Sequence, residues 1–365
     1  MGLKMGIVGL PNVGKSTLFN ALTRTAAAQA ANFPFCTIEP NVGEVAIPDA
    51  RLEKLASVAK SQQIIPARMS FVDIAGLVKG ASKGEGLGNQ FLANIRECDA
   101  IAYVLRCFED GNVIHVANKI DPIADAEVVE TELMLADLES LEKRLPGLEK
   151  KAKGGDKEAK LTVDLINRSL ALLGEGKSAR LVQRSPEEEK AFTELQLLTS
   201  KPALFVCNVD EGSAATGNAM TKLVEDYAKS HNAAVIIISA EIESQLSQLP
   251  DAEQKEYLES LGLEEPGLNR LIREAYDLLG LQTYFTAGPK EARAWTIHKG
   301  DKAPQAAGVI HSDFERGFIR AQTIAFDDYV TLGGEVPAKE AGKARDEGKE
   351  YVVKDGDVML FKFNT

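Results

Sequence analysis

Short apolar blocks alternate with amphipathic segments along the chain, which indicates strands that alternate with helices. The apolar blocks predict buried strands at residues 3–9, 42–47, 68–74, 99–108, 201–208 and 232–240. Apolar positions three and four residues apart predict helices at 15–24, 87–98 and 266–280, with another helix between the last two strands. This alternation is typical of a parallel sheet in an α/β domain.

The alternation is interrupted from residue 125 to residue 198, where Leu, Ala, Glu and Lys dominate. Apolar residues recur there at helical spacing, and Gly154 and Gly155 mark the first break. We predict two long antiparallel helices and a third short one, which form a coiled-coil arm inserted in the α/β domain. Residues 142–190 carry 12 basic and 9 acidic side chains. This excess fits either a solvated helical face or an arm that contacts RNA or a ribosomal surface.

After residue 280 the pattern changes to short apolar runs around a polar stretch that contains glycine. The sequence "KDGD" at 354–357 lies between two apolar runs and predicts a hairpin turn. We therefore expect a small β-rich domain at 281–365. The other two predicted parts are a nucleotide-binding domain, formed by 1–124 and 199–280, and the arm at 125–198.

Composition and charge exclude some classes of partner. The chain is 44% hydrophobic and 26% charged, and no apolar run approaches the ~20 residues that span a bilayer, so we expect no membrane partner. A formal charge of −12 argues against nonspecific binding to DNA. Its four cysteines form no CxxC pair, which fits a reducing environment and predicts a cytoplasmic protein.

The segment "GLPNVGKST" at 9–17 matches GxxxxGK[ST], the phosphate-binding loop. A predicted strand precedes it and a predicted helix follows, so backbone amides at the helix N-terminus can hold phosphate oxygens. In this loop Lys15 would neutralise phosphate charge and Ser16 would bind Mg²⁺. The residues predicted to contact the nucleotide phosphates are Asn12, Val13, Gly14, Lys15, Ser16 and Thr17.

Two further segments predict a nucleotide-dependent switch. In "VDIAG", Asp73 ends an apolar strand and would hold Mg²⁺ through water, while the amide of Gly76 could contact the γ-phosphate. In "NFPFCTIEPN", Thr37 could bind Mg²⁺ while a triphosphate is present, although a plain loop hydroxyl is the alternative. Segments that order on the γ-phosphate and release after hydrolysis make a switch.

The residue after Gly76 is Leu77, at a position where many such switches have a glutamine that orients water. A leucine cannot form that hydrogen bond, so the chain must position its nucleophile differently or hydrolyse slowly. Asn12 could help to bind K⁺ near the phosphates in place of an arginine finger. That role is a hypothesis based on residue type and position.

The tetrapeptide Asn118-Lys119-Ile120-Asp121 has the letters of the guanine-reading motif NKxD. The loop that reads the base should follow a strand parallel to the one at 99–108, and parallel neighbours need a crossover of about a dozen residues or more. Only nine residues separate Phe108 from Asn118. Sequence and topology together predict that Asn118 does not read the base.

A second segment, "NVDE" at 208–211, fits the base-reading position better. It follows an apolar strand, and Asn208 precedes Ser239 by 31 residues, which leaves room for one helix and one strand. Glu211 stands where NKxD has aspartate, so the paired hydrogen bond to guanine is not reproduced. Asn208 could brace the phosphate loop, and backbone near Val209 could meet adenine. We predict ATP in preference to GTP, with Asn208, Val209, Glu211 and Ser239 around the base.

These segments, with the inserted helices and the tail "AWTIHKGDKAPQAAGVIHSDFERGFIRAQTI", resemble the YchF/Obg-like ATPases over essentially the full chain. The resemblance implies an α/β P-loop G-type domain, an inserted α-helical coiled coil and a C-terminal TGS domain of the β-grasp type. It also implies slow ATP hydrolysis, in agreement with Leu77, and association with ribosomes. A candidate catalytic histidine of the family matches His115, for which a solvated loop histidine is the alternative.

The leading hypothesis is therefore an ATP-hydrolysing switch that docks on a ribosome or RNA according to its nucleotide. One alternative is a GTPase of the same class, and another is a nucleotide-gated scaffold with negligible turnover, which Leu77 makes reasonable. A small-molecule kinase fits less well, because the sequence has paired switch segments and no evident substrate lid. The sequence does not indicate an oligomeric state.

Overall fold

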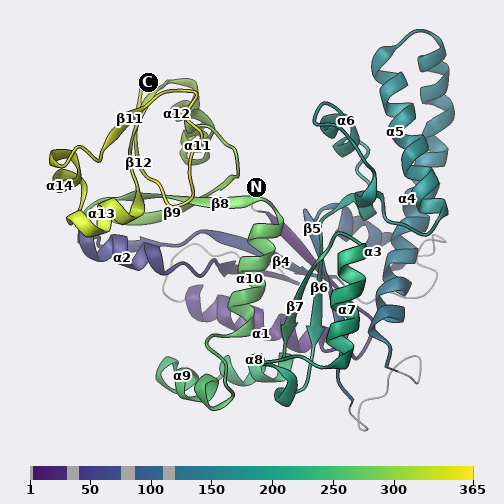
Figure 1. Cartoon of the computed structure of the whole chain (residues 1–365), viewed down its shortest axis with the longest axis horizontal. Helices are drawn as coiled ribbons and strands as arrows, with labels where there is room; N and C mark the ends of the chain where they lie inside the picture. The colour runs from purple at the N-terminus through teal and green to yellow at the C-terminus, as the bar shows by residue number, and fades with distance from the viewer. Residues whose placement is uncertain (1–2, 31–40, 75–86, 110–119, 365) are drawn as a thin grey trace. The chain divides into compact units, whose positions relative to one another are not determined.

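The structure is a computed structural model that describes residues 3–30, 41–74, 87–109 and 120–364. The chain divides into two compact units. Unit 1 holds Met1–Glu44 and Ser70–Leu271, and unit 2 holds Val45–Met69 and Ile272–Thr365. Unit 1 contains most of the first six-stranded sheet, and unit 2 contains all of the second. Helices pack against each sheet (Figure 1).

The first sheet has the strand order β2-β4-β1-β5-β6-β7. Its strands are β1 (Lys4–Val8), β2 (Val42–Ala46), β4 (Arg68–Asp73), β5 (Ala100–Arg106), β6 (Ala203–Asn208) and β7 (Ala234–Ile238). β1 pairs in parallel with β4 and β5, and β6 pairs in parallel with β5 and β7. The parallel sheet predicted from the apolar blocks is confirmed, and every residue of β5 and β6 is buried.

Helices and one short helical turn lie between these strands or follow the last of them, β7 (Figure 1). In chain order they are α1 (Lys15–Ala30), α3 (Leu87–Arg96), η4 (Glu211–Ser213), α7 (Ala219–Ser230), α8 (Ala240–Leu246), α9 (Asp251–Ser260) and α10 (Gly267–Leu278). Apolar side chains of β5 and β6, such as Tyr103 and Phe205, form a buried core with residues of α3 and α7. The carboxyl ends of the parallel strands therefore point to one edge of the sheet, where the phosphate loop lies.

The crossover from β5 to β6 contains the helical arm. Its helices are α4 (Pro122–Lys153), α5 (Lys157–Gly174), η2 (Ala179–Leu181), α6 (Glu189–Thr193) and η3 (Leu198–Ser200). α4 has 32 residues, which is about 48 Å of helix, and α5 packs along it (Figure 1). Buried leucines such as Leu141 and Leu165 join the two helices. The two long helices and the short third one were predicted correctly.

Buried polar contacts fix the base of the arm. Asp137 of α4 accepts hydrogen bonds from the backbone amides of Leu198 and Thr199, both at 2.8 Å, and so caps η3. Burial raises the pKa of Asp137, against the opposing effect of these hydrogen bonds. Glu130 of α4 pairs with Arg180 of η2, and both side chains are at most 5% exposed. The arm is thus attached where the chain leaves the sheet and where it returns.

The second sheet has the strand order β11-β10-β12-β8-β9-β3. Its strands are β3 (Gln63–Ile65), β8 (Leu281–Ala287), β9 (Glu291–His298), β10 (Phe318–Ile324), β11 (Arg345–Glu347) and β12 (Val358–Phe363). The helices of unit 2 are α2 (Ala50–Ala59), α11 (Ala303–Ile310), α12 (Ser312–Arg316), α13 (Phe326–Leu332) and α14 (Glu335–Glu340). Tyr284 and Phe361 lie in its core with the alanines of α11.

Two features of unit 2 differ from the sequence predictions. Residues 45–69 belong to this unit, because β3 pairs in parallel with β9 from Gln63 to Ile65. The predicted hairpin at "KDGD" is wrong. Residues 354–357 do form a turn, but Val352 before it bridges to Lys302, whereas β12 after it pairs with β10 and β8. A local turn signal does not specify which strands will pair across it.

Among the described residues, no helix combines the length and the apolar character needed to cross a bilayer.

Candidate functional site

The phosphate loop lies between β1 and α1. Gly14 has φ +93°, in the left-handed region that favours glycine, and a Cβ placed there would lie 2.1 Å from Nδ2 of Asn208. Asn12 also has a positive φ, of 64°, which asparagine tolerates better than most residues. The loop therefore needs glycine at position 14 both for its backbone angle and for the close approach of Asn208.

Lys15 and Asp73 form an ion pair at the carboxyl edge of the sheet. They come from different segments, because Lys15 begins α1 and Asp73 ends β4. β4 is the parallel neighbour of β1, and Asp73 pairs in register with Ile7 of β1. Their side chains are 11% and 19% exposed. The structure therefore brings together two residues that the sequence assigned to phosphate and to Mg²⁺. Ser16 and Thr17 are exposed in the first turn of α1.

Asn208, the last residue of β6, connects three parts of the site. Its Nδ2 donates to the Val13 carbonyl at 2.9 Å, and its Oδ1 accepts from the Ala240 amide at 2.9 Å. The side chain is buried. The prediction that Asn208 braces the phosphate loop is confirmed, and the structure adds a link to the N-terminus of α8.

Val209 and Ser239 directly follow the neighbouring strands β6 and β7. The side chain of Val209 lies in the hydrophobic core, and its amide donates to the Ile238 carbonyl at 2.9 Å. Ser239 is buried and is the N-cap residue of α8. The Val209 amide is therefore already bonded to the last residue of β7.

Asp210 and Glu211 are both exposed, but they have different surroundings. The Asp210 carboxylate accepts from the amide of Ser213 at 3.0 Å and from its hydroxyl at 3.2 Å, and so caps η4. Partial burial, followed by the charges of Glu211 and Glu241, raises the pKa of Tyr257 on α9. Glu211 and Glu241 each lie near enough to Tyr257 for their charges to act on its hydroxyl.

The tetrapeptide at 118–121 contributes a helix cap. Asp121, the residue that would bond guanine if this were the base-reading motif, is the N-cap of α4 and accepts from the Ala124 amide at 3.1 Å. β6 pairs in parallel with β5 from Ala203 to Asn208, as the base-reading strand should. The predicted place of this strand in the sheet is thus confirmed, and the base-reading role of residues 208–211 stays a prediction.

Several predicted site residues lie outside the described part of the chain. They are Thr37, Gly76, Leu77, His115 and Asn118. Their assigned roles stay predictions.

The structure adds residues that the sequence reasoning did not select. Asn218 caps α7, and its Nδ2 donates to the carbonyl of Cys107 at 2.7 Å, which ties α7 to the residue that follows β5. Arg106 is fully buried, and its guanidinium lies over the Phe108 ring at 4.8 Å. A hydrogen bond with Cys107, together with burial, raises the pKa of Cys207. The asparagine before an amphipathic helix was a visible capping signal.

The chain matches two family models. Residues 4–136 match MMR_HSR1, described as "50S ribosome-binding GTPase", and residues 281–364 match YchF-GTPase_C, described as "Protein of unknown function (DUF933)". The chain is 57% identical over 364 residues to the "Ribosome-binding ATPase YchF" of Escherichia coli O157:H7, which covers 100% of both chains. It is 53% identical over 366 residues to the protein of that name from Bacillus subtilis (strain 168), again covering 100% of both.

A solved structure is similar over nearly the whole chain. The "Structure of the Schizosaccharomyces pombe YchF GTPase" matches with a TM-score of 0.89 and 38% identity, covering 99% of this chain and 98% of that one. The predicted fold class, a G-type α/β domain with further helical and β-rich parts, is confirmed by this likeness and by the family match at 4–136. The names of these relatives differ in the nucleotide they specify.

Proposed function

This chain belongs to the YchF family, and from that premise we propose that it is an ATP-hydrolysing switch that binds ribosomes in a nucleotide-dependent way. The observation that carries the choice of ATP is the geometry of residues 208–211. Asn208 is committed to the phosphate loop, and Asp210 is committed to the cap of η4. The fourth residue of this segment, where NKxD has the aspartate that bonds guanine, is therefore Glu211.

Nucleotide phosphates would bind at the N-terminus of α1. Residues Asn12 to Thr17 lead into and open this helix, where backbone amides without helical partners and the helix dipole favour negative charge. Lys15 would exchange part of its contact with Asp73 for the phosphates. This role explains why a half-buried lysine sits in a loop that Asn208 holds in one shape.

The residues present fit a magnesium ion bound together with a nucleotide. Ser16 and Thr37 would supply oxygen ligands, and Asp73, which lies against Lys15, would hold the ion through water. Within the described residues there is no cluster of three or more His, Cys, Asp or Glu that could hold a metal, which suits an ion that takes part of its ligands from phosphates. When bound, Mg²⁺ would neutralise charge that develops on the phosphate oxygens.

At the base end, the carbonyl of Val209 can accept from the 6-amino group of adenine, whereas guanine has an oxygen at that position. Glu211 is one methylene longer than the aspartate of NKxD, so it does not reproduce the paired bond to guanine. Losing such a pair costs roughly 1–3 kcal/mol or more. Ser239 would shape the pocket through the cap of α8.

Hydrolysis would be slow because Leu77 cannot orient water. We assign Gly76 to the γ-phosphate from its place in the motif at 72–76, and His115 as the candidate catalytic histidine that the family resemblance implies. K⁺ near Asn12 would assist, and equal turnover in K⁺ and Na⁺ buffers would rule that part out.

The partner would be a ribosomal surface, and RNA is the part of it that a basic arm could contact. The last turn of α4 carries Lys150, Lys151 and Lys153, beside the break at Gly154. Lysines grouped at a helix end suit contact with phosphates. We place the protein in the cytoplasm, where ribosomes and a reducing environment coincide.

The decisive experiment compares ATP and GTP binding by calorimetry for the unmodified chain and for Glu211→Asp. Glu241→Gln, which removes the charge of another exposed glutamate, is the control. We expect ATP to bind at least about tenfold more tightly, and Glu211→Asp to narrow that ratio. Tight, selective GTP binding by the unmodified chain would instead support a GTPase. Phosphate release with and without ribosomes then separates an enzyme from a scaffold, since a scaffold gives no turnover in either case.

A further inference from the structure

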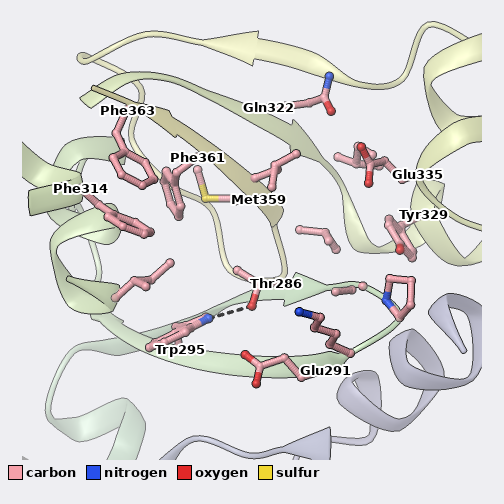
Figure 2. A pocket seen from close by; sticks show the side chains of 18 residues that line it. Thr286, Glu291, Trp295, Phe314, Gln322, Tyr329, Glu335, Met359, Phe361 and Phe363 are labelled. Carbon is pink, nitrogen blue, oxygen red and sulfur yellow. Dashed lines mark hydrogen bonds between the residues drawn. The ribbon is translucent and has the colours of Figure 1, made fainter. Parts of the chain in front are cut away.

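Unit 2 contains a cavity where its sheet opens between β8 and β12. These neighbouring parallel strands share the pair Val358↔Phe285, which is the one registered pair between them among the described strand residues. β12 runs on to Phe363 beside β10, while β8 runs on to Ala287 beside β9. Beyond Val358 the two strands separate, and a cavity of about 680 Å³ lies between them (Figure 2).

One end of this cavity is aromatic. Figure 2 shows Phe314, Phe361 and Phe363 gathered on one side, with Trp295 on the facing strand and Met359 beside them. The rings of Phe314 and Phe363 stack at 3.7 Å between centroids, with 24° between their planes. Both are only half-buried. Aromatic rings and a methionine sulfur offer a surface that suits another flat ring.

Trp295 is held in a fixed orientation at the cavity wall. Its indole N–H donates to Oγ1 of Thr286 at 3.0 Å, as Figure 2 shows. The guanidinium of Arg293 lies 4.0 Å from the ring centroid. The polar atom of the indole is therefore satisfied, and the ring is positioned before any ligand arrives.

The other end of the cavity is polar but has little net charge. Gln322, Tyr329 and Glu335 lie there, with Glu291 on the strand below (Figure 2). Glu335 is already paired with Lys339. Among the lining residues, all within the described chain, Lys290 is the one cation, and it is the residue before Glu291 in the sequence. A phosphate-bearing ligand would find no cluster of cations here.

We propose that this cavity between β8 and β12 binds an uncharged small molecule that has a planar aromatic ring and an amide-like polar edge. The ring would lie among Trp295, Phe314 and Phe363, and the polar edge would face Gln322 and Glu291. The volume is within the range of ligand pockets in proteins, about 300–1,000 Å³, and exceeds that of a single ring. This site is independent of the phosphate loop, because every lining residue belongs to unit 2.

The chain contains one tryptophan, so fluorescence excited at the indole reports on this cavity alone. The probes for the full-length protein are benzamide, its anion analogue benzoate, and the non-planar cyclohexanecarboxamide. We expect benzamide to quench Trp295 emission in a saturable way, with affinity that is roughly millimolar for so small a molecule. Benzoate and cyclohexanecarboxamide should each bind several times more weakly. Saturation-transfer NMR on the same three probes provides a readout that does not depend on the indole.

Phe363→Leu keeps an apolar side chain at the cavity and removes one ring. This variant should bind benzamide about three- to tenfold more weakly, which is the range that one aromatic contact accounts for. Val352→Ala, at an exposed residue outside the cavity lining, is the matched control and should bind benzamide as the unmodified chain does. The proposal is overturned by non-saturable quenching, by equal binding of benzamide and cyclohexanecarboxamide, by tighter binding of benzoate, or by unchanged affinity in Phe363→Leu.

Discussion

The side-chain amide of Asn208 donates a hydrogen bond of 2.9 Å to the carbonyl of Val13 and thereby joins the end of β6 to the phosphate loop. The other end of the same amide accepts from Ala240 at 2.9 Å. One buried side chain thus fixes the loop that would hold phosphates against the segment that would enclose the base. The shape of both halves of the nucleotide site depends on it.

We expect Asn208→Ala to weaken ATP binding about 10- to 100-fold, because two buried hydrogen bonds are lost and the phosphate loop loses its brace. Calorimetric titration with ATP measures the effect. Asn167→Ala, at an exposed position of α5, is the control and should leave ATP affinity unchanged. Equal ATP affinity in both variants would show that the brace has no role in binding.

Lys15→Met should reduce ATP turnover by about 100-fold or more, because the variant keeps side-chain length and removes the charge that would stabilise the phosphates. The substitution also leaves Asp73 without the cation it contacts. Steady-state phosphate release measures the loss, and circular dichroism checks that the fold is retained. A folded Lys15→Met protein with normal turnover would contradict the assignment.

The buried pair of Glu130 and Arg180 should matter more for stability than an exposed pair on the same helix. Glu130→Gln leaves the Arg180 charge without its partner at a site where both side chains are at most 5% exposed, and we expect a loss of about 3–5 kcal/mol. Glu139→Gln breaks the exposed pair with Lys143, which solvent screens, and should leave the free energy of unfolding nearly unchanged. Urea denaturation of the two variants checks the contrast, and similar losses would refute it.

Glu243 should make stability depend on pH. It is buried in α8 and accepts from the amides of Gly267 at 2.7 Å and Leu268 at 3.3 Å, at the start of α10. Burial raises its pKa to about 7 from 4.5, against the opposing effects of these hydrogen bonds and of Arg270. Because the folded state holds the proton more tightly, this contribution to stability is complete below pH 4.5 and is lost as pH rises to 7.

Two and a half pKa units correspond to roughly 3 kcal/mol at most. Glu243→Gln should therefore flatten the decline in melting temperature between about pH 5 and pH 7.5. Thermal unfolding across that range measures it, and Glu241→Gln, at an exposed residue of the same helix, should keep the decline. If the melting temperature of Glu243→Gln falls with pH as steeply as that of the unmodified protein, the carboxylate of Glu243 is not the titrating group.

The sequence by itself determined the local elements and the phosphate loop. Apolar blocks of strand length and helical spacing depend on near neighbours in the chain, so β5, β6 and the two long helices of the arm were found within a few residues. The loop at 9–17 was equally visible, because its function requires glycine, lysine and serine at fixed spacing. Crossover length was enough to predict that the strand parallel to β5 is the one at 203–208 and does not end near Asn118.

Only the tertiary structure decided which distant segments meet. No local pattern indicates that β3 would pair with β9 or that Asp137 would cap η3. The turn at 354–357 is the clearest example. The sequence placed the turn correctly, but the strand after it pairs with β10 and β8 and not with the segment before the turn. Strand pairing and buried polar contacts depend on packing between residues far apart in sequence, and that packing is a property of the whole fold.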